Sequence, residues 1–116
     1  MPKFFLGINL YEFYRLSPEL SIKHAVILDD IRDWCVKYGD RKEDNQITVD
    51  DVLAQWIDCQ TLADNTPLLQ LKSVASISLI IKDLEIEKYI KVIRHHQQKL
   101  YFQLLEKTEK LYRKKK

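Results

Sequence analysis

The chain has 116 residues, of which 46% are hydrophobic and 31% are charged, and its net charge is +2. This size suits one domain with a single core, and the composition excludes disordered and membrane-spanning classes. Two glycines and three prolines argue against an all-β fold with many tight turns. We expect residues 1–116 to form one domain, with a core over residues 16–105 and a basic tail over residues 106–116.

The charges are distributed unevenly along the chain. Residues 1–39 carry equal numbers of acidic and basic groups, whereas residues 40–88 carry ten acidic and five basic groups. Residues 89–116 carry nine basic and two acidic groups, a net charge of +7. The positive field is therefore concentrated near the C-terminus, where it favours an anionic partner.

The two cysteines, Cys35 and Cys59, match no CxxC or other metal-ligand spacing. They predict reduced thiols in a cytoplasmic protein rather than a disulfide. The apolar run Phe4-Phe5-Leu6 is too short for a signal peptide, and no run approaches the roughly 20 apolar residues that span a bilayer. We expect no membrane partner.

The N-terminal third predicts one long helix. Residues 4–16 are rich in aromatics and fit neither helical nor strand periodicity, so we expect an extended or mixed segment there. The next helix begins at Ser17 or at Ser21, and Ser17-Pro18 is typical of a helix start; the apolar stripe of this helix is predicted over residues 21–38. Its acidic pair Asp29-Asp30 is expected on a solvated face. Its inward stripe comprises Ala25, Ile27, Leu28, Ile31, Trp34, Cys35 and Tyr38.

A second helix is predicted from Thr48 onward, after a polar loop at residues 39–46. Thr48 is expected to cap this helix, with Asp50 and Asp51 in its first turn, where the helix dipole favours acids. The apolar residues that follow recur at i, i+3, i+4, i+7 and i+8, a helical spacing. They are Val49, Val52, Leu53, Trp56 and Ile57.

The next segment leaves one boundary open. Thr66-Pro67 is typical of a helix start, so residues 67–86 form either one helix or two, with a slight preference for a break near Ser73. The helix over residues 73–84 is expected to bury Val74, Ile77, Ile81 and Leu84. Its outward positions are Ala75, Ser76, Ser78, Leu79, Lys82 and Asp83.

Two strand-like runs follow directly, residues 89–93 and 99–105, and they flank the polar tip Arg94-His-His-Gln-Gln98. This order predicts a β-hairpin. The C-terminal segment can form an amphipathic helix through Leu104, Leu105, Thr108, Leu111 and Tyr112. Two roles remain open for that helix: a homodimer contact, or packing against the chain's own core at Phe4, Phe5 or Tyr14.

Residues 16–34 resemble the first helix of winged-helix domains in phage and plasmid replication proteins, with Ala25-Val26-Ile27-Leu28 as the core motif and Trp34 near the helix end. Residues 72–90 are similar to the recognition helix and first wing strand of that family. The resemblance covers residues 16–105. It implies an α+β, mainly α fold with three core helices, a two-stranded β-hairpin wing and a C-terminal helix.

The resemblance also implies binding to double-stranded DNA. Two departures weaken sequence-specific reading: the outer helix positions hold Ala75, Ser76, Ser78 and Leu79 instead of Arg or Lys, and Lys88 replaces the usual Gly before the wing. We therefore expect contacts led by the wing or the tail, mainly to phosphates. The alternative is a solvated hairpin tip and basic end. The candidate DNA-binding residues are Lys72, Ser73, Ser76, Lys82, Lys91, Arg94, His95, Gln97, Lys99, Arg113 and Lys114.

Metal binding and catalysis find no support in the sequence. Adjacent His95 and His96 on a strand point to opposite faces, so they cannot easily share one ion. No phosphate-binding loop, GxSxG or HExxH motif occurs. We expect no cofactor, no metal and no enzymatic activity.

The sequence favours a small DNA-binding protein of a phage, plasmid or other mobile element, acting in replication or transcriptional control. The alternative is an interaction or assembly module with a protein partner and no DNA binding. Leu79, on an otherwise small and polar helix face, is the residue that favours this second interpretation.

Overall fold

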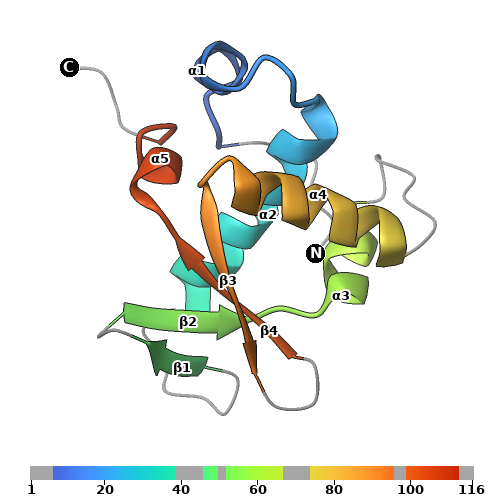
Figure 1. Cartoon of the computed structure of the whole chain (residues 1–116), viewed down its shortest axis with the longest axis vertical. Coiled ribbons are helices and arrows are strands. Elements are labelled where there is room, and N and C mark those ends of the chain that lie inside the picture. Colours follow the sequence, from blue (N-terminus) through green and yellow to red (C-terminus); the bar gives the residue numbers. More distant parts are fainter. Residues whose placement is uncertain (1–6, 39–45, 50–51, 67–73, 96–98, 113–116) are drawn as a thin grey trace.

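A computed structural model describes residues 7–38, 46–49, 52–66, 74–95 and 99–112, with some residues at element ends described by their backbone alone. This part of the chain has an α+β fold with more residues in helices than in strands (Figure 1). In chain order the elements are α1 (Leu10–Leu16), α2 (Ile22–Tyr38), β1 (Gln46–Val49), β2 (Val52–Trp56), α3 (Cys59–Asn65), α4 (Val74–Ile86), β3 (Ile90–His95), β4 (Lys99–Leu104) and α5 (Glu106–Glu109).

Helix α1 lies where the sequence predicts an extended or mixed segment, so that prediction was wrong. The Asn9 side chain caps the helix by accepting the backbone N–H of Glu12 at 3.1 Å. Asparagine at the N-cap with glutamate three residues later is the spacing of a capping box. Arg15 then pairs with Glu12 at 2.8 Å, and Phe13 turns into the core.

Helix α2 confirms the helix predicted over residues 21–38 and is the central element of the core. It contacts α3, α4, β2 and β4. Of the two predicted starting residues, Ser17 is instead the C-cap of α1, whereas Ser21 directly precedes the first residue of α2, Ile22. The side chains of α2 that are fully buried in the core are Ala25, Ile27, Leu28 and Ile31.

The face of α2 that carries Asp29 and Asp30 is buried, so the prediction of a solvated pair was wrong; each is 1% exposed. The Asp29 carboxylate accepts the backbone N–H of Gly7 at 3.2 Å and the hydroxyl of Tyr112. The Arg32 guanidinium lies 4.0 Å from the centroid of the Tyr112 ring. Residues from the two ends of the described chain therefore cover this face and bond to the Asp29 carboxylate.

Strands β1 and β2 replace the helix predicted from Thr48, and that prediction was also wrong. The strands pair antiparallel from Gln46↔Gln55 to Val49↔Val52. Ala54 and Gln55 are both buried although they point to opposite faces of the sheet. Strand β2 is thus covered on both faces, and its apolar residues do not follow the alternation of a half-exposed strand.

The four described strands form one antiparallel sheet in the order β1-β2-β4-β3. Strands β3 and β4 confirm the predicted hairpin, with a register from Ile90↔Leu104 to His95↔Lys99. Strand β2 joins this hairpin through Gln55↔Phe102 and Trp56↔Tyr101. A strand from the middle of the chain therefore extends the C-terminal hairpin into a sheet.

Helices α3 and α4 pack against α2 and against each other. The Thr66 hydroxyl donates to the Leu62 carbonyl at 2.9 Å at the C-terminal end of α3, whereas the sequence placed Thr66 at a helix start. Helix α4 confirms the helix predicted over residues 73–84. Its buried side chains are Ile77, Ile80, Ile81 and Leu84; whether residues 67–73 extend it lies outside the described residues.

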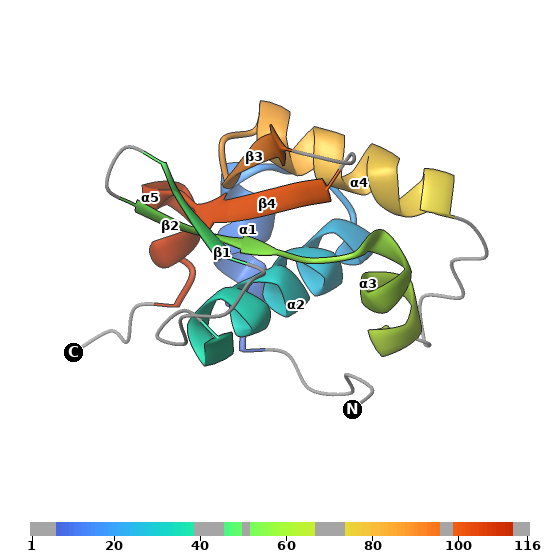
Figure 2. The same cartoon turned by 90° about the horizontal axis from the view of Figure 1, so that it is seen from below.

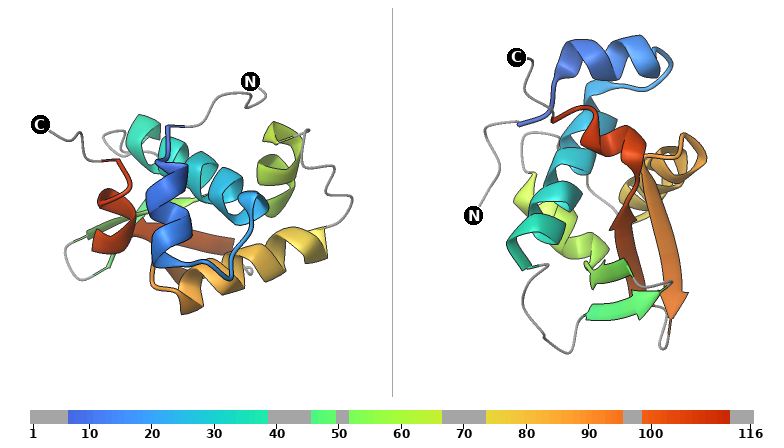
Figure 3. Two further views of the ribbon diagram at one scale, coloured as in Figure 1. Left: turned by 90° about the horizontal axis from the view of Figure 1, so that it is seen from above. Right: turned by 90° about the vertical axis from the view of Figure 1, so that its left-hand side faces the viewer.

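The strands gather toward one end of the molecule, and α1 and α5 lie toward the other end (Figure 1). Figure 2 views the molecule from the end at which the strands lie. The same separation is seen from a third direction in the right-hand view of Figure 3. Phe102 and Val92 from the sheet join α2 and α4 side chains in one hydrophobic core. Burial of this apolar surface is the main stabilising contribution to the fold.

The C-terminal segment contains a single helical turn, α5, and its apolar side chains join the chain's own core. Leu111 is buried in that core, and Leu104 and Tyr112 pack against it. The apolar side chains of this segment therefore pack within the monomer, which is one of the two roles that the sequence left open. A homodimer through this segment stays a prediction.

Candidate nucleic-acid interface

The β3–β4 hairpin presents exposed basic side chains. Along β3, Ile90 and Val92 are buried, whereas Lys91 and Arg94 are exposed. Strand alternation explains the outward position of Lys91, because neighbouring side chains point to opposite faces. Arg94 lies one pair from the last described pair of the hairpin, His95↔Lys99. By the same alternation Arg94 lies on the face of Ile90 and Val92, so β3 carries one exposed basic side chain on each face, Lys91 near the base of the hairpin and Arg94 near its tip.

The predicted site residues are distributed over several places. Lys82 is exposed on α4 and Ser76 is half-buried there, so the structure does not bring either onto the hairpin with Lys91 and Arg94. His95 and Lys99 pair with each other in the hairpin, and only their backbone is described. Lys72, Ser73, Gln97, Arg113 and Lys114 lie outside the described residues.

The outward face of α4 is poor in groups that read bases. Ala75, Ser78, Leu79 and Ile86 are all exposed on this helix, together with Lys82. Recognition of base edges depends mostly on Arg, Asn and Gln side chains. The exposed basic side chains of β3 suit contacts with phosphates, whereas the outward face of α4 has few groups that could recognise base edges.

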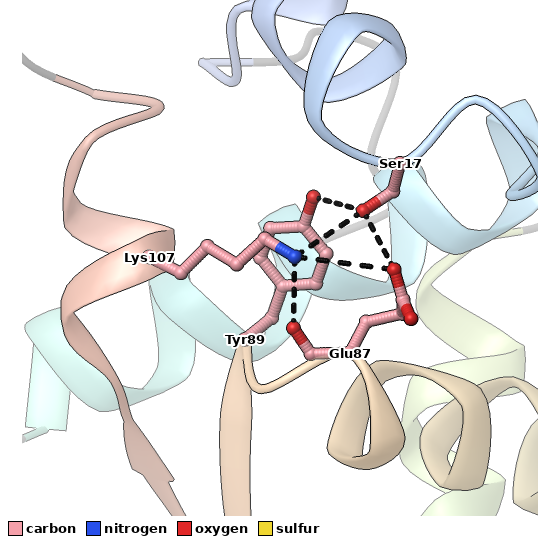
Figure 4. A network of polar contacts seen from close by, with 4 residues as sticks. All are labelled: Ser17, Glu87, Tyr89 and Lys107. Atoms are coloured by element: carbon pink, nitrogen blue, oxygen red, sulfur yellow. Dashed lines mark hydrogen bonds and ion pairs between the residues drawn. The ribbon is translucent and has the colours of Figure 1, made fainter.

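A cluster of four polar side chains fixes the base of the hairpin (Figure 4). The Ser17 hydroxyl lies 2.7 Å from the Tyr89 hydroxyl and 3.1 Å from a Glu87 carboxylate oxygen. The Lys107 ammonium donates to the Glu87 carbonyl at 2.9 Å and lies 4.4 Å from the Tyr89 ring centroid. We call these four residues the hairpin clamp, because they join the end of α1, the turn after α4, the start of β3 and α5.

The electrostatics of the hairpin clamp follow from its contacts. A hydrogen bond with Glu19, then one from Ser17 and the charge of Lys107, lower the pKa of the Glu87 carboxyl. Burial raises the pKa of the Tyr89 phenol, so this hydroxyl stays protonated at neutral pH. Within the clamp, the Lys107 ammonium and the Glu87 carboxylate lie 3.9 Å apart.

A serine near a lysine and a tyrosine also occurs in enzymes that use an activated hydroxyl nucleophile. Here the Ser17 side chain is 0% exposed, and it closes the C-terminal end of α1. A nucleophile must be reachable by its substrate, and Ser17 is not. The arrangement holds elements together and offers no site for the chemistry of acyl transfer.

The turn between α4 and β3 sets the direction of the hairpin. Lys88 has a φ of 65°, and its N–H donates to the Glu85 carbonyl at 3.1 Å. The N–H of Tyr89 donates to the Leu84 carbonyl at 3.0 Å. These two bonds form a Schellman motif with Lys88 at the position that glycine usually occupies. Backbone hydrogen bonds therefore fix the turn that connects α4 to the hairpin.

Sequence reasoning missed the hairpin clamp and the Schellman turn. Ser17 lies 70 residues from Glu87 and 90 from Lys107 along the chain, so no local spacing marks the clamp. Lys88 did carry a signal, because it stands where the resembled family has glycine. The turn is kept although glycine is absent, because Lys88 adopts the positive φ that glycine usually supplies.

Other chemistry has little basis in the described part of the chain. His24 accepts the backbone N–H of Ser21 at Nδ1 and contacts Asp83 through Nε2 at 2.8 Å, which places it in a structural contact. No group of three potential metal ligands among His, Cys, Asp and Glu occurs in the residues described. Among the helices described, none is long and apolar enough to cross a bilayer.

Both cysteines are free thiols and half-buried. Burial raises the pKa of Cys35 to about 12 and also raises the pKa of Cys59. A thiolate is the reactive form of cysteine, so neither environment activates a nucleophile.

Comparisons with protein families, with characterised proteins and with solved structures give no match to this chain.

Proposed function

We propose that the chain is a winged-helix domain that binds double-stranded DNA without catalysis, with the β3–β4 hairpin as its wing. The observation that carries the proposal is the pair of exposed basic side chains, Lys91 and Arg94, on a hairpin that directly follows a helix. Charge neutralisation of phosphates is the main source of affinity for duplex DNA.

The order of the elements supports the winged-helix assignment. Helix α2, strand β2, helices α3 and α4, and then the β3–β4 hairpin follow one another along the chain. Strand β2 pairs with β4. The strand that precedes α3, the second of these three helices, therefore belongs to the same sheet as the proposed wing. This connectivity is typical of winged helices; α1 and β1 are additions to it.

In this proposal the wing leads the contact, and phosphates are its main target. Lys and Arg side chains that meet phosphates position a protein on DNA without selecting a sequence. A role in replication or transcriptional control of a phage, plasmid or other mobile element accords with such a module.

Fluorescence anisotropy with a labelled duplex of random sequence tests the proposal at about 50 mM and about 200 mM salt. Binding should be measurable at the lower salt and weaker at the higher one. Absence of binding at the lower salt would exclude the DNA-binding function. Lys23→Ala, at an exposed basic position on α2, should bind as the wild type does.

A second candidate function is an interaction module that binds protein and not DNA. The exposed apolar side chains Leu79 and Ile86 on α4 favour it. A pull-down repeated with and without nuclease separates the two functions, because a partner held through DNA is lost after digestion whereas a direct protein partner is retained.

A further inference from the structure

Three exposed basic side chains recur at intervals of three residues where the chain enters and follows β3. They are Lys88, in the turn before the strand, and Lys91 and Arg94 on the strand itself. A chain extends by at most about 3.3–3.6 Å per residue, so the Cα atoms of Lys88 and Arg94 lie no more than about 22 Å apart. Lys88 is the member of this row that the candidate DNA-binding residues do not include.

Strand β3 lies at an edge of the described sheet, whose order is β1-β2-β4-β3. Lys91 and Arg94 are on opposite faces of this strand, because neighbouring side chains alternate. Long basic side chains on the two faces of an edge strand can both reach a ligand that approaches the strand edge-on. An elongated polyanion that lies along β3 and the turn before it would therefore meet all three basic side chains.

The Lys88 side chain has no partner within the part of the chain that the structure describes. It is exposed, and it makes no hydrogen bond or ion pair there. The neighbouring carboxylate of Glu87 is directed into the hairpin clamp, where it accepts the Ser17 hydroxyl at 3.1 Å and lies 3.9 Å from the Lys107 ammonium (Figure 4). Glu87 is therefore not the partner of Lys88, and the Lys88 ammonium is available to a ligand.

The backbone conformation of Lys88 disfavours a residue with a side chain. Its φ of 65° is adopted most easily by glycine, and asparagine also tolerates it. Strained residues of this kind are concentrated at functional sites. A lysine at the C-terminal end of a helix also gains from the helix dipole, and this is the structural alternative. The dipole acts on stability, so a measurement of binding separates the two explanations.

We propose that Lys88 binds a phosphate of duplex DNA and extends the basic row of Lys91 and Arg94 toward the C-terminal end of α4. This inference rests on the proposed DNA-binding function and adds a residue to its contact surface. The lysine ammonium is a compact charge with three hydrogen-bond donors, which suits a phosphate and reads no sequence. Phosphate binding gives the strained side chain a function that glycine could not supply.

Fluorescence anisotropy with a labelled duplex of random sequence measures this contact between about 50 mM and about 200 mM salt. Lys88→Gly should weaken binding and lower the magnitude of the slope of log affinity against log salt by about 0.9, the value for one phosphate. Glycine suits the positive φ, so the variant should stay folded, and urea unfolding checks this. A folded variant with the affinity and slope of the wild type would overturn the proposal.

Two more variants at this position separate charge from backbone conformation. Lys88→Arg keeps the charge and should keep the slope, whereas Lys88→Asn tolerates the positive φ without the charge and should behave as Lys88→Gly does. The matched control is Lys82→Ala, which removes an exposed lysine from α4 and should leave the slope unchanged. An equal loss in this control would attribute the effect to net charge and would contradict a contact at Lys88.

The same titrations distinguish this inference from the function on which it rests. Absence of wild-type binding at about 50 mM salt would exclude DNA binding itself. If Lys91→Ala, Arg94→Ala lowers the slope but Lys88→Gly does not, the hairpin contact stands and the role of Lys88 is wrong. The expected result is a further decrease of about 0.9 when Lys88→Gly is added to that double variant, because each residue contacts a separate phosphate.

Discussion

Lys88 adopts a backbone conformation that favours glycine, with a φ of 65°. A side chain at such a φ brings its Cβ close to the backbone and costs roughly 1–2 kcal/mol. The Schellman hydrogen bonds to the Glu85 and Leu84 carbonyls hold the residue there in spite of this cost. The strain marks Lys88 as a position where glycine, which has no Cβ, should be favoured.

Lys88→Gly should therefore stabilise the protein, by roughly 0.5–1 kcal/mol after the larger chain entropy of glycine is subtracted. Urea unfolding followed by circular dichroism measures the change. The matched control is Lys82→Gly in the exposed interior of α4, which should destabilise by a similar amount. Destabilisation by Lys88→Gly would show that the side chain has a role that outweighs its backbone strain.

The hairpin clamp predicts an order of stability losses at Ser17 and Tyr89. Ser17→Ala removes the hydroxyl that bonds both Glu87 and Tyr89, and it leaves the Tyr89 hydroxyl without that partner. The cost should be about 1–3 kcal/mol, against roughly 0.5–1.5 kcal/mol for Tyr89→Phe. The double variant should lose less than the sum of both, because they share one hydrogen bond. Strict additivity in urea unfolding would exclude the shared bond.

Tyr112 links stability to alkaline pH. Burial, and then its hydrogen bond to Asp29, raise the pKa of this phenol above its usual value of about 10. The folded protein then retains a proton that the unfolded chain releases, so stability is unaffected below about pH 10 and falls above it. Tyr112→Phe should reduce the decline between about pH 10 and about pH 11, with Tyr89 contributing to what remains. An unchanged slope in urea unfolding would contradict the link.

At the scale of elements, α2, α4 and the β3–β4 hairpin could be predicted from the sequence. The two helices are long, and each buries one periodic stripe of apolar side chains. The hairpin has two strand-like runs that flank a polar tip. In these segments local pattern and tertiary packing favour the same structure.

Strands β1 and β2 could not be predicted in the same way. The apolar residues Val49, Val52, Leu53, Trp56 and Ile57 fit helical spacing, and β2 lacks the alternation of a half-exposed strand because Ala54 and Gln55 are both buried. Pairing with β4 decides the structure of β2, and that partner lies far along the chain. The spacing of apolar residues along the chain does not reveal pairing with a strand that is distant in sequence.

Helix α1 was missed although its capping signal is present. Asn9 and Glu12 have the spacing of a capping box. Tyr11 and Tyr14 are exposed, so the aromatic residues of this segment do not mark its buried face. The helix is only seven residues long, and its packing rather than its periodicity stabilises it.

Ala54 distinguishes the strand from the helix that the sequence predicts. The side chain is 0% exposed in β2, whereas a helix with the predicted stripe would place position 54 outside that stripe. Ala54→Asp should cost more than about 2 kcal/mol, since it buries an unpaired carboxylate. Thr48→Asp, at an exposed position of β1, should cost less than about 1 kcal/mol. Equal small losses in thermal unfolding would argue against a buried β2.

For the candidate site, the sequence predicted which residues carry the charge but not what positions them. Lys91 and Arg94 follow from the composition of the hairpin. The hairpin clamp depends on Ser17 and Lys107, which are remote in sequence and meet only in the folded chain. Long-range polar contacts of this kind carry no local signal.

At the scale of the whole molecule, the proposed contacts lie on different surfaces. Exposed basic side chains occur on β3, whereas the outward face of α4 carries the exposed apolar side chains Leu79 and Ile86. Binding to DNA and binding to a protein should therefore respond to different substitutions.

The salt dependence of duplex binding by hairpin variants is the most direct test of wing-led DNA binding. The slope of log affinity against log salt reports the number of phosphates neutralised, at about 0.9 for each. The double variant Lys91→Ala, Arg94→Ala should bind random duplex more weakly and lower the magnitude of this slope by about 2, whereas Lys23→Ala, Lys82→Ala should leave it unchanged. An unchanged slope in the hairpin variant, or an equal loss in the control, would contradict a contact led by the hairpin.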